Sequence, residues 1–358
     1  MDKYIGFDID TVKTAVCVIQ QGKKEKFYTI GSDIVSMITF LQKQQHSNTQ
    51  LHLTFEISGQ AGYLYDTLMD HVDTITVSNP SKMTWIYRTA KKNDRIDARK
   101  QALLLSIGEI PKVYMPDKTI RQWRETILHR RNLIGRAVQV KNRIRAVLKS
   151  QGLFKALYSG SWWKKENRIW MRTLIQKRWS SGYLWQMKLS DLLDQLDLLE
   201  GQVKQITTYL DLYLSRQSGG KLLMSIPGVG PRTAEAVLAY TDDIRRFKKV
   251  KHYCAYFGLT PKLDESGTTK RMGHISKQGP SVVRWLVGES AWRVVKQSPA
   301  MRHFYERTLA GQPGRKKIAI VAVARKLLTI MRAMMLSGEL YNEELISRSS
   351  EAEFKKIA

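Results

Sequence analysis

The chain has few cysteines and no long apolar run. Its 358 residues include two cysteines, Cys17 and Cys254, which stand far apart and form no CxxC pair. This usage argues against a disulfide framework and against a cysteine-based zinc site. No run of about 18 apolar residues occurs, and the first residues lack a signal-peptide pattern, so the sequence predicts no membrane span. We therefore expect a cytoplasmic protein with no membrane partner.

Acidic residues are scarce relative to basic ones. The chain has 59 Lys and Arg against 32 Asp and Glu, a formal net charge of +27. Dispersed basic residues that bind phosphates release counterions, so this balance indicates a nucleic-acid partner. A basic ribosome-associated or membrane-surface protein is the alternative, but no basic amphipathic anchor stands out. A nucleotide-binding P-loop is also missing, so nothing in the sequence calls for ATP.

The first part of the chain alternates between strand and helix patterns. Apolar residues at every second position, with the turn signals between them, predict strands at 4–10, 14–20, 26–31, 51–58 and 73–80. Helical patterns occupy 33–44, 62–71 and 95–108. This order predicts a mixed sheet with helices packed on it, in an α/β domain that covers residues 1–112.

The rest of the chain is predicted to be mostly helical. Residues 117–150 form a long basic helix, and a seam with 3-4 spacing follows: Trp185, Leu189, Leu192, Leu196, Leu199, Val203, Ile206 and Leu210. Such a seam indicates a coiled coil, either with the basic helix or between protomers. We expect a middle region at 113–216, a helical domain at 221–345 and a tail at 346–358.

The middle region carries candidate nucleic-acid contacts. The basic residues singled out are Arg130, Arg131, Lys141, Arg143 and Arg145. Tryptophans stand among further basic residues at 153–185: Trp162, Trp163, Trp170, Trp179 and Trp185. Aromatic rings in such a setting can stack on bases. For most of them, sealing a helix-helix core is the more frequent role, and the purpose of this stretch stays open.

Two motifs of the helical domain point to phosphate chemistry. The segment IPGVGPRTAEAVL, residues 226–238, is similar to a helix-hairpin-helix hairpin, in which Gly228 and Gly230 would allow a tight turn against a phosphate. A plain helix-turn-helix corner is the alternative. Residues 253–279 predict a polar loop that places Ser266 near basic residues, which are Lys270, Arg271 and Lys277. Basic groups beside a serine suit attack on a phosphodiester, although a Ser-Gly pair alone indicates only a turn.

Four carboxylates are candidates for a metal site. Asp8 and Glu56 lie on the polar faces of two predicted strands, and Asp94 and Asp97 lie at i, i+3 on one side of a predicted helix. If the strands are neighbours and the helix packs over their ends, the four charges converge and need a hard cation. Mg²⁺ prefers such oxygen ligands, and two ions about 4 Å apart would stabilise both oxygens of a phosphoryl transfer.

The ordered motifs carry a resemblance to a known family. They are YIGFD, FEISG, NDRIDAR, SIPGVGPRTA, FGLTP, ESG and GHISKQG. In this order they resemble the DEDD-type transposases of bacterial insertion sequences, which include bridge-RNA-guided recombinases and related site-specific invertases. The resemblance implies a RuvC-like, RNase H-fold first domain, a coiled-coil middle and a helical C-terminal domain. It also implies that Asp8, Glu56, Asp94 and Asp97 bind the metal and that Ser266 attacks the DNA backbone.

The resemblance further implies the partners. They are double-stranded DNA at the element ends and target, a structured guide RNA, and other copies of the chain in a dimer or tetramer. One departure is Asp10, which follows Asp8 by two residues and could share its role. Two other functions stay open: a RuvC-like junction-resolving endonuclease, which leaves Ser266 unused, and a non-catalytic RNA-binding scaffold, which leaves the carboxylates unexplained.

Overall fold

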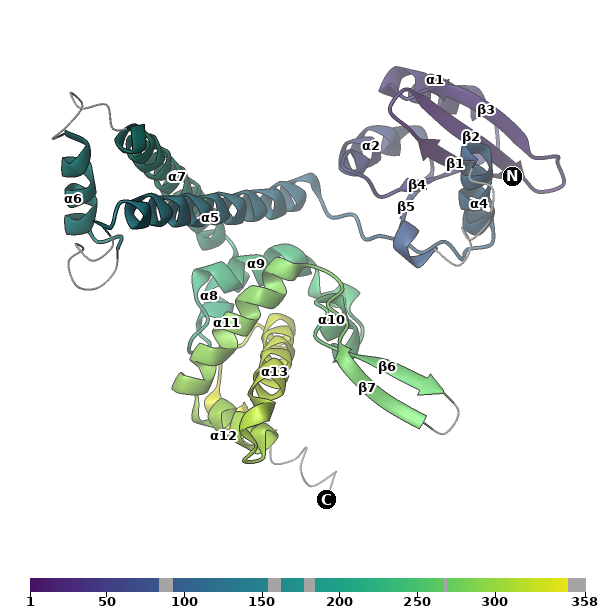
Figure 1. Ribbon diagram of the computed structural model, residues 1–358. Helices are drawn as coiled ribbons and strands as arrows, with labels where there is room; N and C mark the ends of the chain where they lie inside the picture. The colour runs from purple at the N-terminus through teal and green to yellow at the C-terminus, as the bar shows by residue number, and fades with distance from the viewer. Residues whose placement is uncertain (84–92, 154–161, 177–183, 267–268, 347–358) are drawn as a thin grey trace. The chain divides into compact units, whose positions relative to one another are not determined.

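The computed structural model describes residues 1–83, 93–153, 162–176, 184–266 and 269–346, without the side chains of 263–272. It divides into two compact units, Met1–Arg121 and Gln122–Ala358, which are described separately (Figure 1). In the described part of the chain, no helix combines the length and apolarity that crossing a membrane requires. The finer division predicted for the second unit stays a prediction.

The first unit is built on one mixed sheet, as the sequence predicts. Its strands are β1 (Asp2–Ile9), β2 (Lys13–Gln20), β3 (Lys26–Gly31), β4 (Gln50–Glu56) and β5 (Thr74–Ser78). The order is β3-β2-β1-β4-β5. β1 and β3 each pair antiparallel with β2, whereas β1, β4 and β5 run parallel. The helical elements are α1 (Ile34–Gln44), α2 (Ala61–Leu68), η1 (Met69–His71), η2 (Pro80–Lys82) and α4 (Asp94–Ser106).

Both faces of the sheet are covered. On one face, strand residues such as Ile5, Phe7 and Phe55 are fully buried in a core that α1 and α2 complete. On the other face, Ala98 and Ala102 of α4 pack against Ala15 and Cys17 of β2. Small side chains on this second face let the helix come close to the strands, and that closeness positions the candidate site.

Where the structure describes it, the second unit is helical apart from one hairpin. Its helices are α5 (Lys118–Ser150, which starts within the first unit), α6 (Lys165–Gln176), α7 (Leu184–Ser215), α8 (Ser218–Met224), α9 (Pro231–Thr241), η5 (Ile244–Arg246), α10 (Val250–Tyr256), α11 (Ser281–Gln297), α12 (Pro299–Leu309), η6 (Pro313–Arg315) and α13 (Lys316–Ser337). The hairpin consists of β6 (Pro261–Ser266) and β7 (Thr269–Ile275), which extend beyond α10 in Figure 1.

The apolar seam of α7 packs within the chain. Leu189, Leu192, Leu196 and Leu199 are buried in one cluster with α5 residues such as Ile144. The seam is therefore buried within the chain in this structure, whereas a coiled coil stays a prediction. The tryptophans of the basic stretch have the core role: Trp162, Trp163, Trp170 and Trp185 pack against the same cluster. Trp179 lies outside the described residues.

One predicted element is wrong in kind. The polar segment at 253–279, expected as a loop between helices, contains the last residues of α10 and then the β6–β7 hairpin. The register pairs Ser266 with Thr269, so two residues of sequence, one of them Gly267, separate the strands. A two-residue connection with glycine favours a hairpin, and this local signal outweighs the polar composition.

Candidate active site

The two strand carboxylates lie at the same edge of the sheet. β1 and β4 are parallel neighbours, and Phe7 is in register with Phe55. Asp8 and Glu56 each follow by one residue, so they stand side by side at the carboxyl ends of these strands. Side chains alternate between the faces of a strand. Asp8 therefore lies on the same face as Gly6, opposite the face of the fully buried Phe7.

Gly6 identifies which helix covers that face. A Cβ built on Gly6 would lie 2.3 Å from the backbone oxygen of Ala98 and 2.8 Å from the backbone nitrogen of Ala102. The backbone of α4 thus touches β1 where glycine leaves room, since real Cβ atoms do not approach other atoms so closely. The carboxylates of Asp8 and Glu56 therefore project from the face that α4 covers.

Contacts of α4 with β3 give its direction along the sheet. The guanidinium of Arg95 lies 4.8 Å from the ring centroid of Phe27, which is at the level of Gly6 in the register. One turn later Arg99 binds Glu25, with nitrogen–oxygen distances of 2.6 and 2.8 Å. Glu25 precedes β3 and lies toward the amino end of β1. The first turn of α4 therefore lies toward the carboxyl ends of β1 and β4.

The helix start is encoded locally. The side chain of Asn93 accepts a hydrogen bond of 3.0 Å from the backbone N–H of Arg95 and caps the helix. Asp94 and Asp97 occupy the first turn, where the helix dipole stabilises negative charge. Asp94 is exposed, and the Asp97 side chain is 15% exposed, with the Lys100 ammonium 3.7 Å away. The four predicted carboxylates thus belong to one edge of the first unit.

These carboxylates are not drawn into a closed cluster. Across the described ranges, no three His, Cys, Asp or Glu side chains lie close enough together to hold a metal ion. The donor set nevertheless fits a divalent cation in its chemistry, because it consists of carboxylate oxygens that approach from two strands and one helix. Asp10 does not share the strand face of Asp8: β1 ends at Ile9, and Asp10 lies exposed in the following turn.

The second unit presents Ser266 on the β6–β7 hairpin. The backbone places Ser266 at the end of β6, Lys270 opposite Glu265, and Arg271 opposite Asp264. Their side chains lie outside the described part of the structure. Lys277 is exposed and has a positive φ of 55°, which is uncommon for a residue other than glycine.

The base of this hairpin is tightly built. A Cβ on Gly258, where φ is +69°, would lie 2.2 Å from the backbone oxygen of Gln278. A Cβ on Gly279 would lie 1.9 Å from the backbone oxygen of Tyr256. Arg284 Nη1 donates hydrogen bonds of 3.1 and 3.0 Å to the backbone oxygens of Phe257 and Gln278. The FGLTP and GHISKQG motifs therefore form one clamp that fixes the root of the strand bearing Ser266.

The GVGP turn has a clear packing role. It joins α8 to α9, and Pro231 is the first residue of α9 after the N-cap Gly230. A Cβ on Gly228, where φ is +86°, would lie 2.8 Å from the backbone nitrogen of Val294 in α11. Glycine is required here for close approach to α11. A Cβ on Gly230 would meet nothing within 4 Å. A phosphate that binds this turn would therefore approach it on the side of Gly230.

The predicted basic contacts of α5 separate into different environments. Arg130 is buried and pairs with the fully buried Glu235 of α9 at 2.9 Å, which takes Arg130 out of the phosphate-binding set. Arg131 lies 5.4 Å over the ring of Trp285, which is 52% exposed. Arg143 is exposed, and Arg145 lies 5.4 Å over the ring of Trp163.

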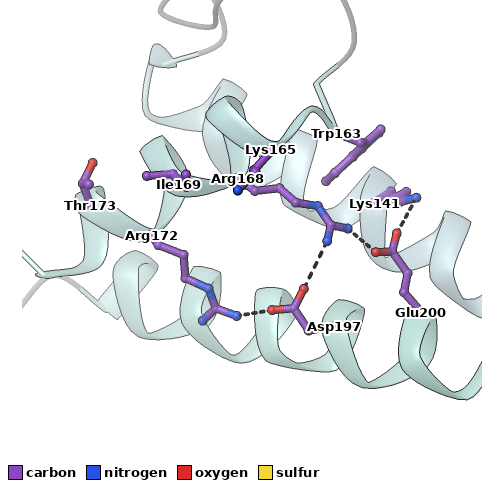
Figure 2. Close-up of a pocket in the computed structure, with 9 residues that line it drawn as sticks. All are labelled: Lys141, Trp163, Lys165, Arg168, Ile169, Arg172, Thr173, Asp197 and Glu200. Atoms are coloured by element: carbon purple, nitrogen blue, oxygen red, sulfur yellow. Dashed lines mark hydrogen bonds and ion pairs between the residues drawn. The ribbon is translucent and has the colours of Figure 1, made fainter.

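Figure 2 shows how Lys141, another predicted contact, and two arginines of α6 pair with carboxylates. The pocket it draws has a volume of about 640 Å³. Arg168 of α6 pairs with Glu200 and, at 3.3 Å, with Asp197, both on α7. Arg172 reaches Asp197 at 2.7 Å, and Lys141 reaches Glu200 at 2.8 Å. The pairs of Arg168 and Arg172 hold α6 on α7, and the pair of Lys141 joins α5 to α7, so part of the basic charge here serves the fold.

Sequence reasoning missed two residues beside these sites. The role of Arg284 at the base of the hairpin could not be predicted, because its partners are backbone oxygens that only the fold brings together. Gln101 of α4 is 0% exposed, and neither polar atom of its side chain has a hydrogen-bond partner. Its position four residues after Asp97 was the available signal.

Two family descriptions match the chain. A family described as "Transposase", the DEDD transposases of IS110 type, matches residues 5–152. A second, described as "Transposase IS116/IS110/IS902 family", matches residues 220–306. The first match spans the candidate carboxylates, and the second spans the GVGP turn and the hairpin.

Several known proteins are similar over most of their length. The "Probable family 20 transposase" of Pseudomonas aeruginosa is 24% identical over 284 residues, 76% of this chain and 79% of that protein. The "Transposase for insertion sequence element IS1111A" of Coxiella burnetii is 26% identical over 333 residues, 89% of each chain. The "Pilin gene-inverting protein" of Moraxella lacunata is 24% identical over 350 residues, 96% of this chain and 98% of that protein.

Proposed function

Given that this chain belongs to the IS110 family of DEDD transposases and is a DNA transposase or recombinase, we propose that it cuts and rejoins DNA strands at the ends of an insertion element and at a target. The proposal divides the chemistry between the two units. Carboxylates of the first unit hold a divalent cation, and Ser266 of the second unit is the nucleophile.

The placement of α4 on the sheet is the observation that supports the proposed metal site. Gly6 brings the backbone of α4 against β1, and the direction of α4 sends Asp94 and Asp97 toward the strand ends that bear Asp8 and Glu56. We assign the unit a RuvC-like RNase H fold on the strand order β3-β2-β1-β4-β5 with helices on both faces. DEDD transposases typically use a divalent metal, and Mg²⁺ is the ion we propose here.

The proposed roles of the chain's residues follow. Asp8, Glu56, Asp94 and Asp97 supply oxygen ligands, and the bound cation would stabilise negative charge developing on the scissile phosphate. Ser266 Oγ forms a bond to phosphorus, the bond from phosphorus to the 3′ oxygen breaks, and the hydroxyl proton passes to solvent or to a carboxylate. The 3′ oxygen leaves with the bonding electron pair and takes up a proton from solvent, which gives a free 3′-hydroxyl. The phosphoserine link keeps the bond energy for religation, so no nucleotide cofactor is needed.

The partners we propose are double-stranded DNA and a structured guide RNA, bound by an oligomer of this chain. Exposed basic residues such as Arg143 and Lys277 support phosphate binding. Arg131 beside the half-exposed Trp285 adds a cation and a ring that can stack on a base. In an oligomer, Ser266 of one protomer can serve the carboxylates of another.

A covalent adduct tests the nucleophile. DNA carrying a nick near the cleavage site is incubated with the protein, Mg²⁺ and the element's own transcribed RNA, and protein-linked DNA is counted after denaturation. The wild type is expected to form the adduct, and S266A is expected to form none. S281A, an exposed serine beyond the hairpin, serves as the matched control. An adduct formed by S266A at the wild-type level would refute the assignment of Ser266.

The carboxylates have their own variants in the same assay. D97N is expected to lose both adduct and strand cleavage, whereas D70N, an exposed aspartate of the same unit, keeps them. Cleavage that survives in S266A but not in D97N would favour a RuvC-like junction-resolving endonuclease. RNA binding with no cleavage in any preparation would favour a non-catalytic scaffold.

A further inference from the structure

We infer that Gln101 is a positioning residue of the proposed metal site, whose side-chain amide orients the carboxylate of Asp97 toward the cation. This inference rests on the proposed function of the carboxylates. It adds a third residue of α4 to the proposed metal site, after the two aspartates of the first turn.

The burial of the Gln101 amide without hydrogen bonds costs stability in this structure. Its side chain is 0% exposed, and neither Nε2 nor Oε1 has a hydrogen-bond partner. Each buried polar group without a partner costs about 1–3 kcal/mol, and an apolar side chain of similar shape would avoid that cost. A buried amide with both polar atoms unsatisfied therefore points to partners that arrive in another state of the protein.

The helix directs this amide toward Asp97. Gln101 follows Asp97 by four residues, so the two lie on one face of α4, one turn apart. Helical side chains lean toward the amino end of their helix, so the Gln101 amide leans toward the first turn of α4. Ala98, three residues before Gln101 and hence on the same side of α4, is buried against the sheet, so Gln101 lies beside the part of α4 that covers the strands.

The carboxylate of Asp97 makes a long ion pair, which a bound cation would replace. Among the described residues, its cationic partner is the Lys100 ammonium at 3.7 Å, beyond the usual length of a charged hydrogen bond. With a divalent cation held by the carboxylates, Gln101 Nε2 would donate to one oxygen of Asp97 and leave the other oxygen for the ion. Ligating carboxylates are commonly held by such outer hydrogen bonds.

The test measures ion binding rather than catalysis. The full-length chain is titrated with Mn²⁺, and separately with Mg²⁺, while its melting temperature is followed, since a ligand that binds only the folded state raises that temperature with concentration. Q101M removes both polar atoms and keeps the length of the side chain. We expect Q101M to melt at or above the wild-type temperature without ions, and to bind the ion about 10-fold more weakly or worse.

Gln186 provides a matched control. It is a buried glutamine of the second unit whose Nε2 donates a hydrogen bond of 2.8 Å to the backbone oxygen of Leu174. Q186M is expected to lower the melting temperature without ions and to leave the apparent ion affinity unchanged. The two glutamines should thus respond in opposite ways to the same substitution.

Three results decide the matter. Wild-type ion affinity in Q101M, together with loss of ion binding in D97N, would overturn the role of Gln101 and leave the metal site standing. Unchanged ion binding in D97N would instead overturn the proposed metal site itself. If Q101M does not fold, Q101N takes its place, because it keeps a buried amide that is one methylene too short; ion affinity retained in Q101N would overturn the inference.

Discussion

Arg130 of α5 and Glu235 of α9 form an ion pair of 2.9 Å in which the two side chains are 8% and 0% exposed. Arg232 of α9 binds the other carboxylate oxygen of Glu235 at 2.8 Å and also pairs with Asp211 of α7. One buried carboxylate thus links three helices through two arginines. Burying charges is costly even when they are paired, so this network need not add to the stability of the fold.

This network predicts a pH dependence of stability. Burial raises the pKa of Glu235 from its ordinary 4.5 to about 7, against the opposing effect of Arg130 and Arg232. A carboxyl whose pKa is higher in the folded state stabilises the fold fully below pH 4.5 and loses that contribution as pH rises through about 7. The loss is on the order of 3 kcal/mol. Urea unfolding of wild type and E235Q at pH 5 and pH 8 measures it: the difference between the two proteins should change by this amount. Parallel pH curves for the two proteins would mean that Glu235 is ionised in the fold throughout.

Gly6 predicts a second, local effect. G6A places a methyl group 2.3 Å from the backbone oxygen of Ala98, so α4 must move away from β1. We expect a loss of about 1–3 kcal/mol and a weaker response of the melting temperature to Mn²⁺, because Asp94 and Asp97 move with the helix. G59A is the control, since a Cβ on Gly59 meets nothing within 4 Å and its φ is not positive. Equal melting temperatures for G6A and G59A would contradict the contact.

The hairpin clamp predicts an effect on adduct formation. G258A would bring a methyl group within 2.2 Å of the backbone oxygen of Gln278, at a position where φ is +69°. We expect this change to displace the root of β6 and to reduce the DNA adduct of Ser266 by tenfold or more, in keeping with the cost of misplacing a nucleophile. G273A, on β7, adds a methyl group at ordinary contact distance and should react nearly as the wild type does. The clamp has no role in positioning Ser266 if both variants react alike.

Arg143 and Arg130 should differ in DNA binding. Arg143 is exposed on α5, so R143A removes one phosphate contact and should lower the slope of log affinity against log salt by about 1. Arg130 is buried against Glu235, so R130M should leave that slope unchanged while it alters stability. Binding measured at several salt concentrations separates the two. A slope that falls in R130M and not in R143A would reverse the assignment.

The sequence predicts most of the first unit because its signals are local. Strict alternation places Leu51, Leu53 and Phe55 on one face of β4, and all three are fully buried. The start of α4 is predicted by the acidic first turn. The sequence cannot show that α4 lies on the face of Gly6, because that depends on which small residues meet across the sheet. Burial of Arg130 is equally hidden, since its partner lies 105 residues further along the chain.

The β6–β7 hairpin is an element that the sequence did not predict. Composition marked 253–279 as polar, and polarity alone favours a loop, whereas strand pairing depends on register with a partner strand. Arg284 and Gln101 were missed for a related reason. Arg284 acts on backbone oxygens that only the fold brings together. The missing contacts of Gln101 cannot be read from the sequence, and its position four residues after Asp97 is the only sequence signal.

The two cysteines fall one to each compact unit, and both are fully buried. Burial raises the pKa of Cys17 to about 11 and also raises that of Cys254, so neither thiol forms a reactive thiolate near neutral pH. Each unit therefore contains its own chemical reporter of opening. A thiol reagent will label Cys17 only when the sheet unit opens and Cys254 only when the helical unit opens, so the rates at the two positions read the local stability of the halves independently.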